Sequence, residues 1–238
     1  MDFKKIKEEY RYTTELHSHT NPASDCGKLT PELNVRLYAN LGCSTLTITN
    51  HLSNFRLGKF PTDAELAEFY VADYYRAKKA AEGTSLNVAL GVELRFLNDY
   101  NDYLFYGFEP SDVEKMIYYL NKDVQSFYRD FKNSKNVLIH AHPFRNNMHP
   151  TPLGYVDGIE AFNMHPGANS RIGIATRFAA ENDLLVTAGS DYHDPGRHAL
   201  VLMRTKHELR DSFDVADAIK SRDVLFDMSG NIIIPYLW

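Results

Sequence analysis

Two histidines, His17 and His19, are separated by one residue at the end of a short run in which apolar and polar side chains alternate. On a β-strand, residues two positions apart share a face, so the two imidazoles are expected to project together. Asp191 and His193 repeat this spacing in a turn that is rich in glycine and serine. Such pairs bind a metal ion only if other parts of the chain bring further ligands to the same point.

Further imidazoles and carboxylates follow other predicted strands. The complete set is His17, His19, Asp25, His51, Glu93, His142, Asp191 and His193. Mixed imidazole and carboxylate sites suit zinc, manganese or iron, whereas calcium prefers oxygen ligands and structural zinc prefers sulfur. Eight candidates exceed the coordination of one ion, so the sequence predicts two or three divalent ions, with Glu93 able to bridge two of them.

The elements that would position these residues alternate between strand and helix. Strands are expected at 13–17, 44–49, 87–92, 102–108, 136–141, 158–162 and 184–188, and helices at 31–41, 63–81, 111–132 and 170–182. In the 31–41 helix, Thr30 is the expected N-cap and Leu33, Leu37 and Leu41 the expected buried face. Parallel β-α units predict an α/β architecture. A barrel is favoured over an open sheet, because ionisable residues recur after many strands rather than at one switch point.

Composition limits the classes of partner and the setting. The chain of 238 residues has 26 basic and 31 acidic side chains, which argues against a surface that tracks long nucleic acid. Its two cysteines, Cys26 and Cys43, follow neither a disulfide framework nor a zinc-knuckle spacing. Cys26 could be a soft ligand if it lies near a metal, but it is interpreted as a loop cysteine. No signal peptide or membrane span is recognisable, so a cytoplasmic enzyme of one domain, 1–238, is expected, with 199–238 as its C-terminal closure.

Six motifs, in their order along the chain, resemble those of the PHP (polymerase and histidinol phosphatase) family. They are His17-Ser-His-Thr, Ser24-Asp25, Thr49-Asn50-His51, Gly91-Val-Glu93, Ala141-His142-Pro143 and Gly189-Ser-Asp191-Tyr-His193. The resemblance implies a distorted seven-stranded β/α barrel that hydrolyses phosphoesters. It also implies one ion held by His17, His19, Glu93 and Asp191, a second held by Asp25, His51 and His193, and a third shared by Glu93 and His142.

Three positions depart from the family pattern. Asn50 stands where many members have aspartate, and the change is expected to alter a hydrogen bond rather than a ligand. Cys26 interrupts a Ser-Asp-Gly sequence that many members share. Asp102 stands where a histidine is expected after the Glu93 strand, and it is kept as a candidate ligand of the third ion.

The chemistry predicted from these residues is hydrolysis of a small phosphorylated metabolite or nucleotide by a metal-bound hydroxide. His17, His19, Glu93, Asp191 and His193 are the predicted catalytic residues. Arg145 and Arg197, with His165 and more weakly Arg56, are the candidates for binding the substrate, because guanidinium groups hold phosphate oxygens in pairs. Two alternatives stay open: a nuclease or exonuclease of the same family, and a non-catalytic metal-binding regulatory domain.

Overall fold

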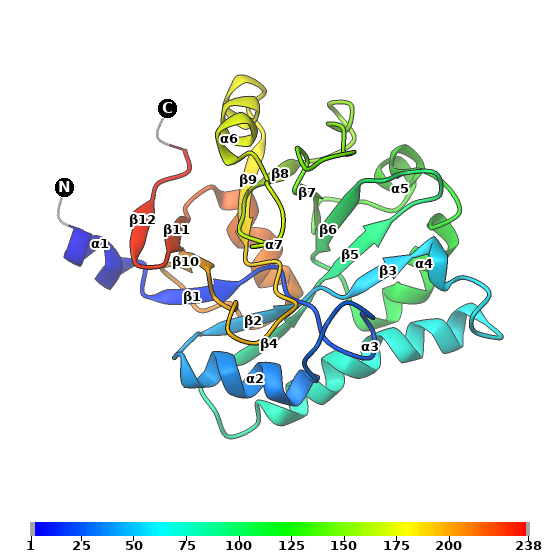
Figure 1. The fold of residues 1–238 in the computed structure, drawn as a ribbon, viewed down its shortest axis with the longest axis horizontal. Helices are drawn as coiled ribbons and strands as arrows, with labels where there is room; N and C mark the ends of the chain where they lie inside the picture. The colour runs from blue at the N-terminus through cyan, green and yellow to red at the C-terminus, as the bar shows by residue number, and fades with distance from the viewer. Residues whose placement is uncertain (1–2, 237–238) are drawn as a thin grey trace.

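In the computed structural model, residues 3–236 are described, and their strands form two six-stranded sheets. The first sheet has the order β12-β11-β10-β1-β2-β4. Its strands are β1 (Tyr12–Glu15), β2 (Thr45–Ile48), β4 (Asn87–Leu90), β10 (Val201–Thr205), β11 (Leu225–Met228) and β12 (Asn231–Ile233). Its β1, β2 and β4 are parallel to one another. Strand β10 pairs with β1, β11 with β10 and β12 with β11, each antiparallel to the strand it pairs with (Figure 1).

The second sheet has the order β3-β5-β6-β7-β8-β9. Its strands are β3 (His51–Ser53), β5 (Val92–Arg95), β6 (Asp102–Tyr106), β7 (Val137–Ala141), β8 (Gly158–Asn163) and β9 (Leu185–Gly189). Strand β6 is antiparallel to both of its neighbours, which corrects the expectation of parallel β-α units throughout. The link 96–101 between β5 and β6 is too short for a crossover helix, so the chain reverses direction there.

The two sheets are joined along the chain. Strand β2 runs into β3 through Thr49 and Asn50, and β4 runs into β5 through Gly91. A Cβ at Gly91 would lie 2.7 Å from Thr49 Cγ2, so only glycine lets these two crossings pass each other. A parallel bridge between Ser18 and Tyr192 makes a further link. The α/β class is therefore correct, but a closed barrel is not confirmed, because within residues 3–236 the ladders form two separate sheets.

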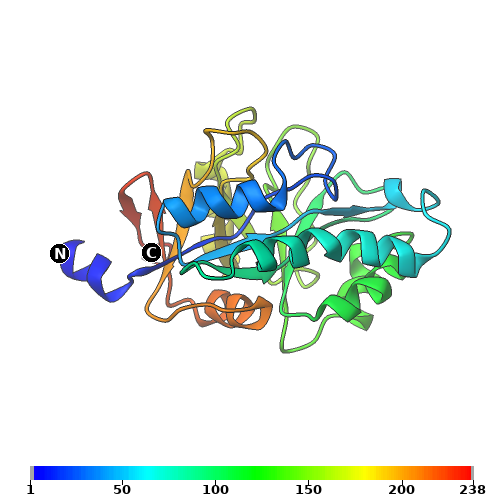
Figure 2. The same ribbon diagram turned by 90° about the horizontal axis from the view of Figure 1, so that it is seen from below.

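Helices lie on the outer sides of the sheets (Figure 1). They are α1 (Phe3–Glu9), α2 (Pro31–Asn40), α3 (Asp63–Ala80), α4 (Val113–Tyr119), α5 (Val124–Asp130), α6 (Ile172–Glu181) and α7 (Ser212–Ser221), with the 3₁₀ turns η1 (Asn54–Arg56) and η2 (Pro110–Asp112). Helices α2 and α3 pack side by side, and α3 also contacts β4 (Figure 2). No described helix is long and apolar enough to cross a membrane.

The buried face of α2 differs from the prediction. Thr30 caps the helix as expected, since its side chain accepts a hydrogen bond from the backbone N–H of Leu33. Leu33 and Leu41 are nevertheless exposed, and Pro31, Asn34, Val35 and Tyr38 form the buried face. The spacing of three and four residues is the same, but the helix is rotated so that Tyr38 reaches the inside. There its hydroxyl donates a 2.7 Å hydrogen bond to Glu15 Oε2.

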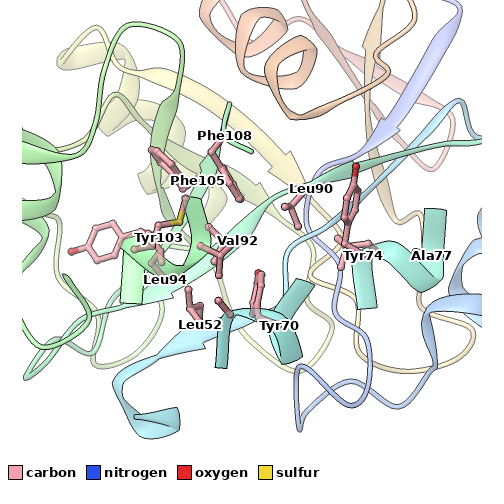
Figure 3. Packing of buried hydrophobic residues seen from close by; sticks show 14 of the residues in the cluster. Leu52, Tyr70, Tyr74, Ala77, Leu90, Val92, Leu94, Tyr103, Phe105 and Phe108 are labelled. Atoms are coloured by element: carbon pink, nitrogen blue, oxygen red, sulfur yellow. The ribbon is translucent and has the colours of Figure 1, made fainter. Parts of the chain in front are cut away.

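A cluster of buried side chains joins α3 to strands β3–β6 (Figure 3). Its members include Leu52, Tyr70, Tyr74, Leu90, Val92, Leu94, Tyr103, Phe105 and Phe108. The hydroxyl of Tyr70 donates hydrogen bonds to the carbonyl oxygens of Asn50 at 2.7 Å and Gly91 at 3.2 Å. The core therefore fixes the backbone where both chains cross between the sheets, directly before His51 and Glu93.

Helix α7 covers one end of the strands. It packs against β4, β6, β7 and β9, which belong to both sheets. At this end Thr45, the first residue of β2, donates a hydrogen bond to the Leu209 carbonyl oxygen, and Gly107, after β6, donates one to Ser212 Oγ. His51 and Glu93 follow β2 and β4 at the end away from α7, and Asp102 begins β6 at the same end. The expected domain of residues 1–238 includes residues 1, 2, 237 and 238, which lie outside the described part.

Candidate metal centre

Four buried side chains, here called the inner group, converge from three parts of the chain. They are His17 and His19 after β1, Glu93 on β5 and Asp191 after β9. His17 Nε2 lies 3.1 Å from His19 Nε2, 3.4 Å from Glu93 Oε2 and 3.6 Å from Asp191 Oδ1. His19 Nε2 lies 3.3 Å from the same Glu93 oxygen and 3.5 Å from the same Asp191 oxygen.

These spacings are those of ligands that share an ion. With metal–ligand bonds of about 2.0–2.2 Å, neighbouring ligand atoms in tetrahedral or octahedral geometry are about 2.8–3.6 Å apart. All five distances within the inner group fall in that range. Glu93 Oε2 is buried and accepts no hydrogen bond from the described residues, although it faces three imidazole nitrogens. A divalent ion would satisfy this oxygen and these nitrogens together.

The protonation of the inner group favours a cation. Burial and the His51 imidazole lower the pKa of His19 to about 3, so His19 is neutral and presents a lone pair. Burial opposes the charge of Asp191, but His17, His19 and Arg145 outweigh it and hold the pKa of Asp191 well below its usual range. Burial opposes the charge of His17 as well, yet Glu160, Asp191 and Glu93 raise the pKa of His17 well above its usual range. The carboxylates of Glu160, Asp191 and Glu93 therefore favour a positive charge at this point.

Two buried carboxylates that the sequence analysis missed hold the inner group in place. Glu160 Oε1, on β8, lies 2.8 Å from His17 Nδ1, so that nitrogen carries the proton and Nε2 points at the group. Glu15 Oε1 accepts hydrogen bonds from the backbone N–H groups of His17 at 3.1 Å and Ser190 at 3.0 Å. The sequence signal at Glu160 is a single acidic residue inside the largely apolar start of β8, whereas Glu15 ends the polar strand β1 and gives no such signal.

Local backbone structure makes room for this arrangement. A Cβ at Gly189 would lie 2.4 Å from both Glu160 Oε1 and His17 Cβ, so β9 can pass the histidine–carboxylate pair only as glycine. Asp191 and His142 have positive φ angles of 50° and 33°, which are uncommon outside glycine. Backbone strain of about 1–3 kcal/mol is expected at such residues, and it is typical of sites where a side chain must be aimed.

A second set, here called the outer group, consists of Cys26, His51 and His193. With His19 they offer four ligand atoms that all lie within 4.8 Å of one another. The His19 ring stacks between His51 and His193, with centroid separations of 4.5 and 4.4 Å. Burial raises the pKa of the Cys26 thiol, but hydrogen bonds with His193 and His51 outweigh this and lower it to about 7. The interpretation of Cys26 as an ordinary loop cysteine does not fit this placement.

Asp25, the ligand expected beside His51 and His193, is not in this group. Its side chain is 77% exposed and pairs with Arg56, with Asp25 Oδ1 2.9 Å from Arg56 Nη2. None of the groups of possible metal ligands among the described residues contains Asp25. The Ser24–Gly27 loop therefore turns the thiol inward and the carboxylate outward.

His142 and Asp102 lie on the remaining side of Glu93. His142 Nε2 is 3.2 Å from Glu93 Oε1 and 3.9 Å from Asp102 Oδ2. His51, Glu93 and Asp102 form a further group of possible ligands. Asp102 is also paired with Arg95, whose guanidinium makes two hydrogen bonds to the carboxylate. Asp102 therefore lies near Glu93 and His142, and its carboxylate is already in contact with the Arg95 guanidinium.

The three predicted substrate-binding residues differ in their placement. Arg145 reaches the inner group, where its guanidinium contacts the Asp191 and Asn163 side chains. His165 lies beside the outer group, and its ring centroid is 5.2 Å from that of His193. Arg197 is exposed, and its charge acts on Asp194 rather than on the centre.

A pocket of about 240 Å³ opens beside the outer group. It is lined by Asp25, Cys26, His51, Ser53, Phe55, Arg56, Lys59 and Arg95. Arg56, Lys59 and Arg95, called the cationic pocket below, carry three positive charges, of which Arg56 is paired with Asp25 and Arg95 with Asp102. The sequence analysis missed Lys59 and Arg95 because neither lies directly next to a predicted ligand motif, whereas Arg56 was the weakest of its candidates.

Asn50, which stands where many members of the resembled family have aspartate, makes a set of buried hydrogen bonds. Asn50 Oδ1 accepts a 2.7 Å hydrogen bond from the Thr20 N–H, and its amide donates to Thr20 Oγ1 at 2.8 Å and Asp73 Oδ2 at 3.3 Å. Asp73 Oδ2 also accepts from Thr20 Oγ1 and from the Ala23 N–H. This buried network fixes the chain directly after His19 and before Cys26.

No family model and no curated protein matches the sequence. The structure is similar to a two-domain protein of Bacteroides vulgatus named as containing a predicted PHP-like metal-dependent phosphoesterase. The TM-score is 0.65 at 15% identity, over 90% of this chain and 64% of that one. The fold is that of PHP-like proteins. Thus the resemblance expected from the motifs is confirmed at the level of the fold, although the chain spans less than two thirds of the Bacteroides protein.

Two further solved structures are similar to this one. A protein of Bifidobacterium adolescentis named as a metal-dependent phosphoesterase has a TM-score of 0.53 at 18% identity, over 86% of this chain and 94% of that one. PsfC of Pseudomonas syringae has a TM-score of 0.59 at 13% identity, over 86% of this chain and 87% of that one. At identities this low, the structural similarity shows the fold alone, and the activity must be argued from the residues of the site.

Proposed function

We propose that this chain is a hydrolase of phosphoesters that requires two or three divalent ions, with zinc, manganese or iron as the candidates. The observation that carries the proposal is the inner group, in which buried Glu93 Oε2 faces three imidazole nitrogens without a hydrogen bond. Imidazole and carboxylate ligands in this combination suit these metals. The PHP-like fold is consistent with it, since similar structures are named as metal-dependent phosphoesterases.

When bound, the divalent ions supply an activated water and offset the charge on the phosphoryl oxygens. The chain's own residues prepare the site for this. Glu160 fixes the protonated nitrogen of His17, so that Nε2 stays free as a ligand. Arg145 holds Asp191 from the side opposite the histidines, which keeps the Asp191 carboxylate ionised and oriented. In this proposal Arg145 positions a ligand, rather than binding the substrate first as its sequence position suggested.

The substrate is proposed to enter through the cationic pocket. Arg56, Lys59 and Arg95 line it together with Cys26 and His51, so an anion bound there lies directly beside the outer group. Guanidinium groups bind phosphate oxygens in pairs, and lysine adds a mobile positive charge. A volume of about 240 Å³ is at the small end for ligand pockets, which favours a small phosphorylated metabolite or nucleotide over a polymer.

The test is hydrolysis by the purified full chain after chelation and after reloading with zinc, manganese or iron. The panel contains phosphomonoesters, small phosphodiesters and a single-stranded oligonucleotide. We expect activity on a small ester only after reloading, its loss in His19→Ala, and its retention in Arg177→Met, which changes an exposed arginine on α6. Metal-loaded protein that cleaves no member of the panel would overturn the proposal, and preference for the oligonucleotide would support the nuclease alternative.

A further inference from the structure

The loop at 24–27 presents a thiol to the centre where the sequence pattern placed a carboxylate. We propose that the Cys26 thiolate, together with His51 and His193, is a ligand of one of the ions, and that Asp25 is not. The inference rests on the proposed metal dependence and specifies one of its sites. It concerns a cysteine that lies among three imidazoles, with every ligand atom of the four residues within 4.8 Å of the others.

The position of Cys26 is fixed from both sides. Before it, the Ser24 N–H donates a 2.8 Å hydrogen bond to the Thr20 carbonyl, and Ser24 Oγ accepts one from the His51 N–H at 2.8 Å. After it, the Lys28 N–H donates to the His193 carbonyl oxygen at 3.0 Å. The loop is thus tied by its backbone to the segments that carry the histidines.

Gly27 brings this loop close to the chain that follows His19. A Cβ at Gly27 would lie 2.9 Å from the carbonyl carbon of Thr20, so a larger residue would push the loop outward. Independent support comes from Glu93, which is 1% exposed and whose Oε2 lies at ion-pair distance from the imidazole nitrogens of His51 (2.9 Å), His19 (3.3 Å) and His17 (3.4 Å). A buried carboxylate oxygen that faces three imidazole nitrogens beside the outer group is the arrangement that a divalent cation would complete.

The alternative ligand, Asp25, is turned away by its own contacts. Its carboxylate pairs with Arg56, and the same Arg56 nitrogen donates a 2.9 Å hydrogen bond to the Ala23 carbonyl oxygen. Bringing Asp25 inward would break this pair. The observed loop conformation therefore selects sulfur over oxygen as the donor from this segment.

A thiolate changes which metal the site prefers. With His19, the group offers one sulfur and three imidazole nitrogens, a combination that suits zinc. Soft sulfur favours zinc, or iron, over manganese, which prefers oxygen. Binding releases the thiol proton to solvent as the sulfur–metal bond forms. The two halves of the centre would then differ in metal preference within one chain.

Cobalt substitution tests this without relying on activity, because a thiolate bound to Co²⁺ gives a near-ultraviolet charge-transfer absorption. Metal-stripped full-length protein is titrated with Co²⁺ and, separately, with zinc in competition with a chelator. We expect the absorption in the unaltered protein and in the controls Cys43→Ser and Asp25→Asn, and its loss in Cys26→Ser. Zinc affinity of the outer site in Cys26→Ser should fall by at least roughly 10–100-fold, as losses of even outer partners of metal ligands do.

The possible outcomes separate this inference from the proposed function. If the protein binds Co²⁺ without the thiolate absorption, or if Asp25→Asn loses an ion that Cys26→Ser keeps, the assignment of Cys26 is wrong and metal-dependent hydrolysis is unaffected. If the protein binds no divalent ion at all, both proposals fail. Cys26→Asp provides a further check. It should restore an ion but shift the preference of the outer site from zinc towards manganese.

Discussion

The inner and outer groups meet at His19 but are built differently. The inner group is buried. The Glu160 carboxylate contacts His17 Nδ1, and the Glu15 carboxylate accepts a hydrogen bond from the Ser190 N–H. In the outer group the side chains of His51 and His193 are 32% and 17% exposed, and Cys26 is exposed beside the cationic pocket. One half therefore has the construction of a fixed ion site, and the other that of a site open to an incoming anion.

The difference shows what burial demands of ionisable groups. A buried charge is tolerated only when it is paired and hydrogen-bonded, and accordingly His17 is paired with Glu160 and Asp191 with Arg145. The outer ligands reach water and are held mainly by the 24–27 loop and the stacked rings. Changes near the inner group should affect folding and metal binding together, whereas changes near the outer pocket should affect substrate binding.

The largest effect is expected at Gly189. In Gly189→Ala the new methyl group would meet Glu160 Oε1 and His17 Cβ at 2.4 Å, so β9 and the inner group must move apart. Overpacking of this kind destabilises by about 1–3 kcal/mol, and the displaced His17 should also lose its ion. Thermal unfolding and metal analysis measure both. Gly173→Ala on α6, where a Cβ meets no atom within 4 Å, is the matched control, and unaltered metal content in Gly189→Ala would contradict the account.

A smaller effect is expected when only the negative charge of Glu160, which contacts His17, is removed. Glu160→Gln keeps a side chain of similar shape but no longer stabilises the Nδ1 proton of His17 as a carboxylate does. Loss of such outer partners typically costs 10–100-fold in metal affinity. Competitive chelation should show this loss for one ion, with the thiolate absorption of the cobalt form unchanged. A loss at the outer site instead would mean that the two groups are not separable.

In the outer half, Arg56→Met should weaken substrate binding rather than chemistry. A hydrogen bond to a charged group contributes about 1.5–3 kcal/mol, so KM should rise roughly tenfold or more while kcat changes little. Steady-state kinetics with a small phosphoester measure the two parameters. The control is Arg177→Met on the surface of α6. A fall in kcat at constant KM would instead place Arg56 in the chemical step.

The smallest effect is expected at the ion pair between α2 and α3, which contains no member of either group. The Arg76 guanidinium holds the pKa of Glu32 at about 2, with Arg76 Nε 2.8 Å from Glu32 Oε1. A lowered folded-state pKa stabilises the fold above the ordinary pKa of glutamate, and this contribution is lost as the pH falls towards 2. Both side chains are largely exposed, so Glu32→Gln should cost about 0.2–1 kcal/mol at neutral pH.

Denaturant unfolding of Glu32→Gln and the unaltered protein, at neutral pH and near pH 2, measures this contribution. The difference between the two proteins should shrink at the lower pH, while metal content and activity at neutral pH stay unchanged. A change in metal content would show that the α2–α3 contact influences the centre.

Periodicity and strand-end chemistry predicted much of this molecule. The strand and helix order is largely as expected, and His17, His19, His51, Glu93, His142, Asp191 and His193 do come together. These residues follow the ends of buried strands, and local patterns report such positions well. The direction of β6 was less accessible, because an aromatic strand reads alike in either orientation and only the short 96–101 link indicates reversal.

Two features of the site depend on three-dimensional packing that adjacency in the sequence does not reveal. Cys26 and Asp25 are neighbours, and which of them turns inward depends on Arg56, Gly27 and the backbone ties of the loop. Glu160 lies 143 positions from His17 in the sequence. Their contact requires glycine at position 189 of β9, because a Cβ there would collide with both side chains. Likewise the face of α2 depends on where Tyr38 finds Glu15, which no helical period specifies.

Arg56 belongs to two of these structures at once. Its guanidinium pairs with Asp25 and the Ala23 carbonyl oxygen, and it also lines the cationic pocket. An anion that recruits Arg56 competes with Asp25 for the same guanidinium, and Asp25 shares its loop with Cys26. Thermodynamic linkage then makes the effect reciprocal. If an anion in the pocket changes the metal affinity by some factor, the metal changes the anion affinity by the same factor.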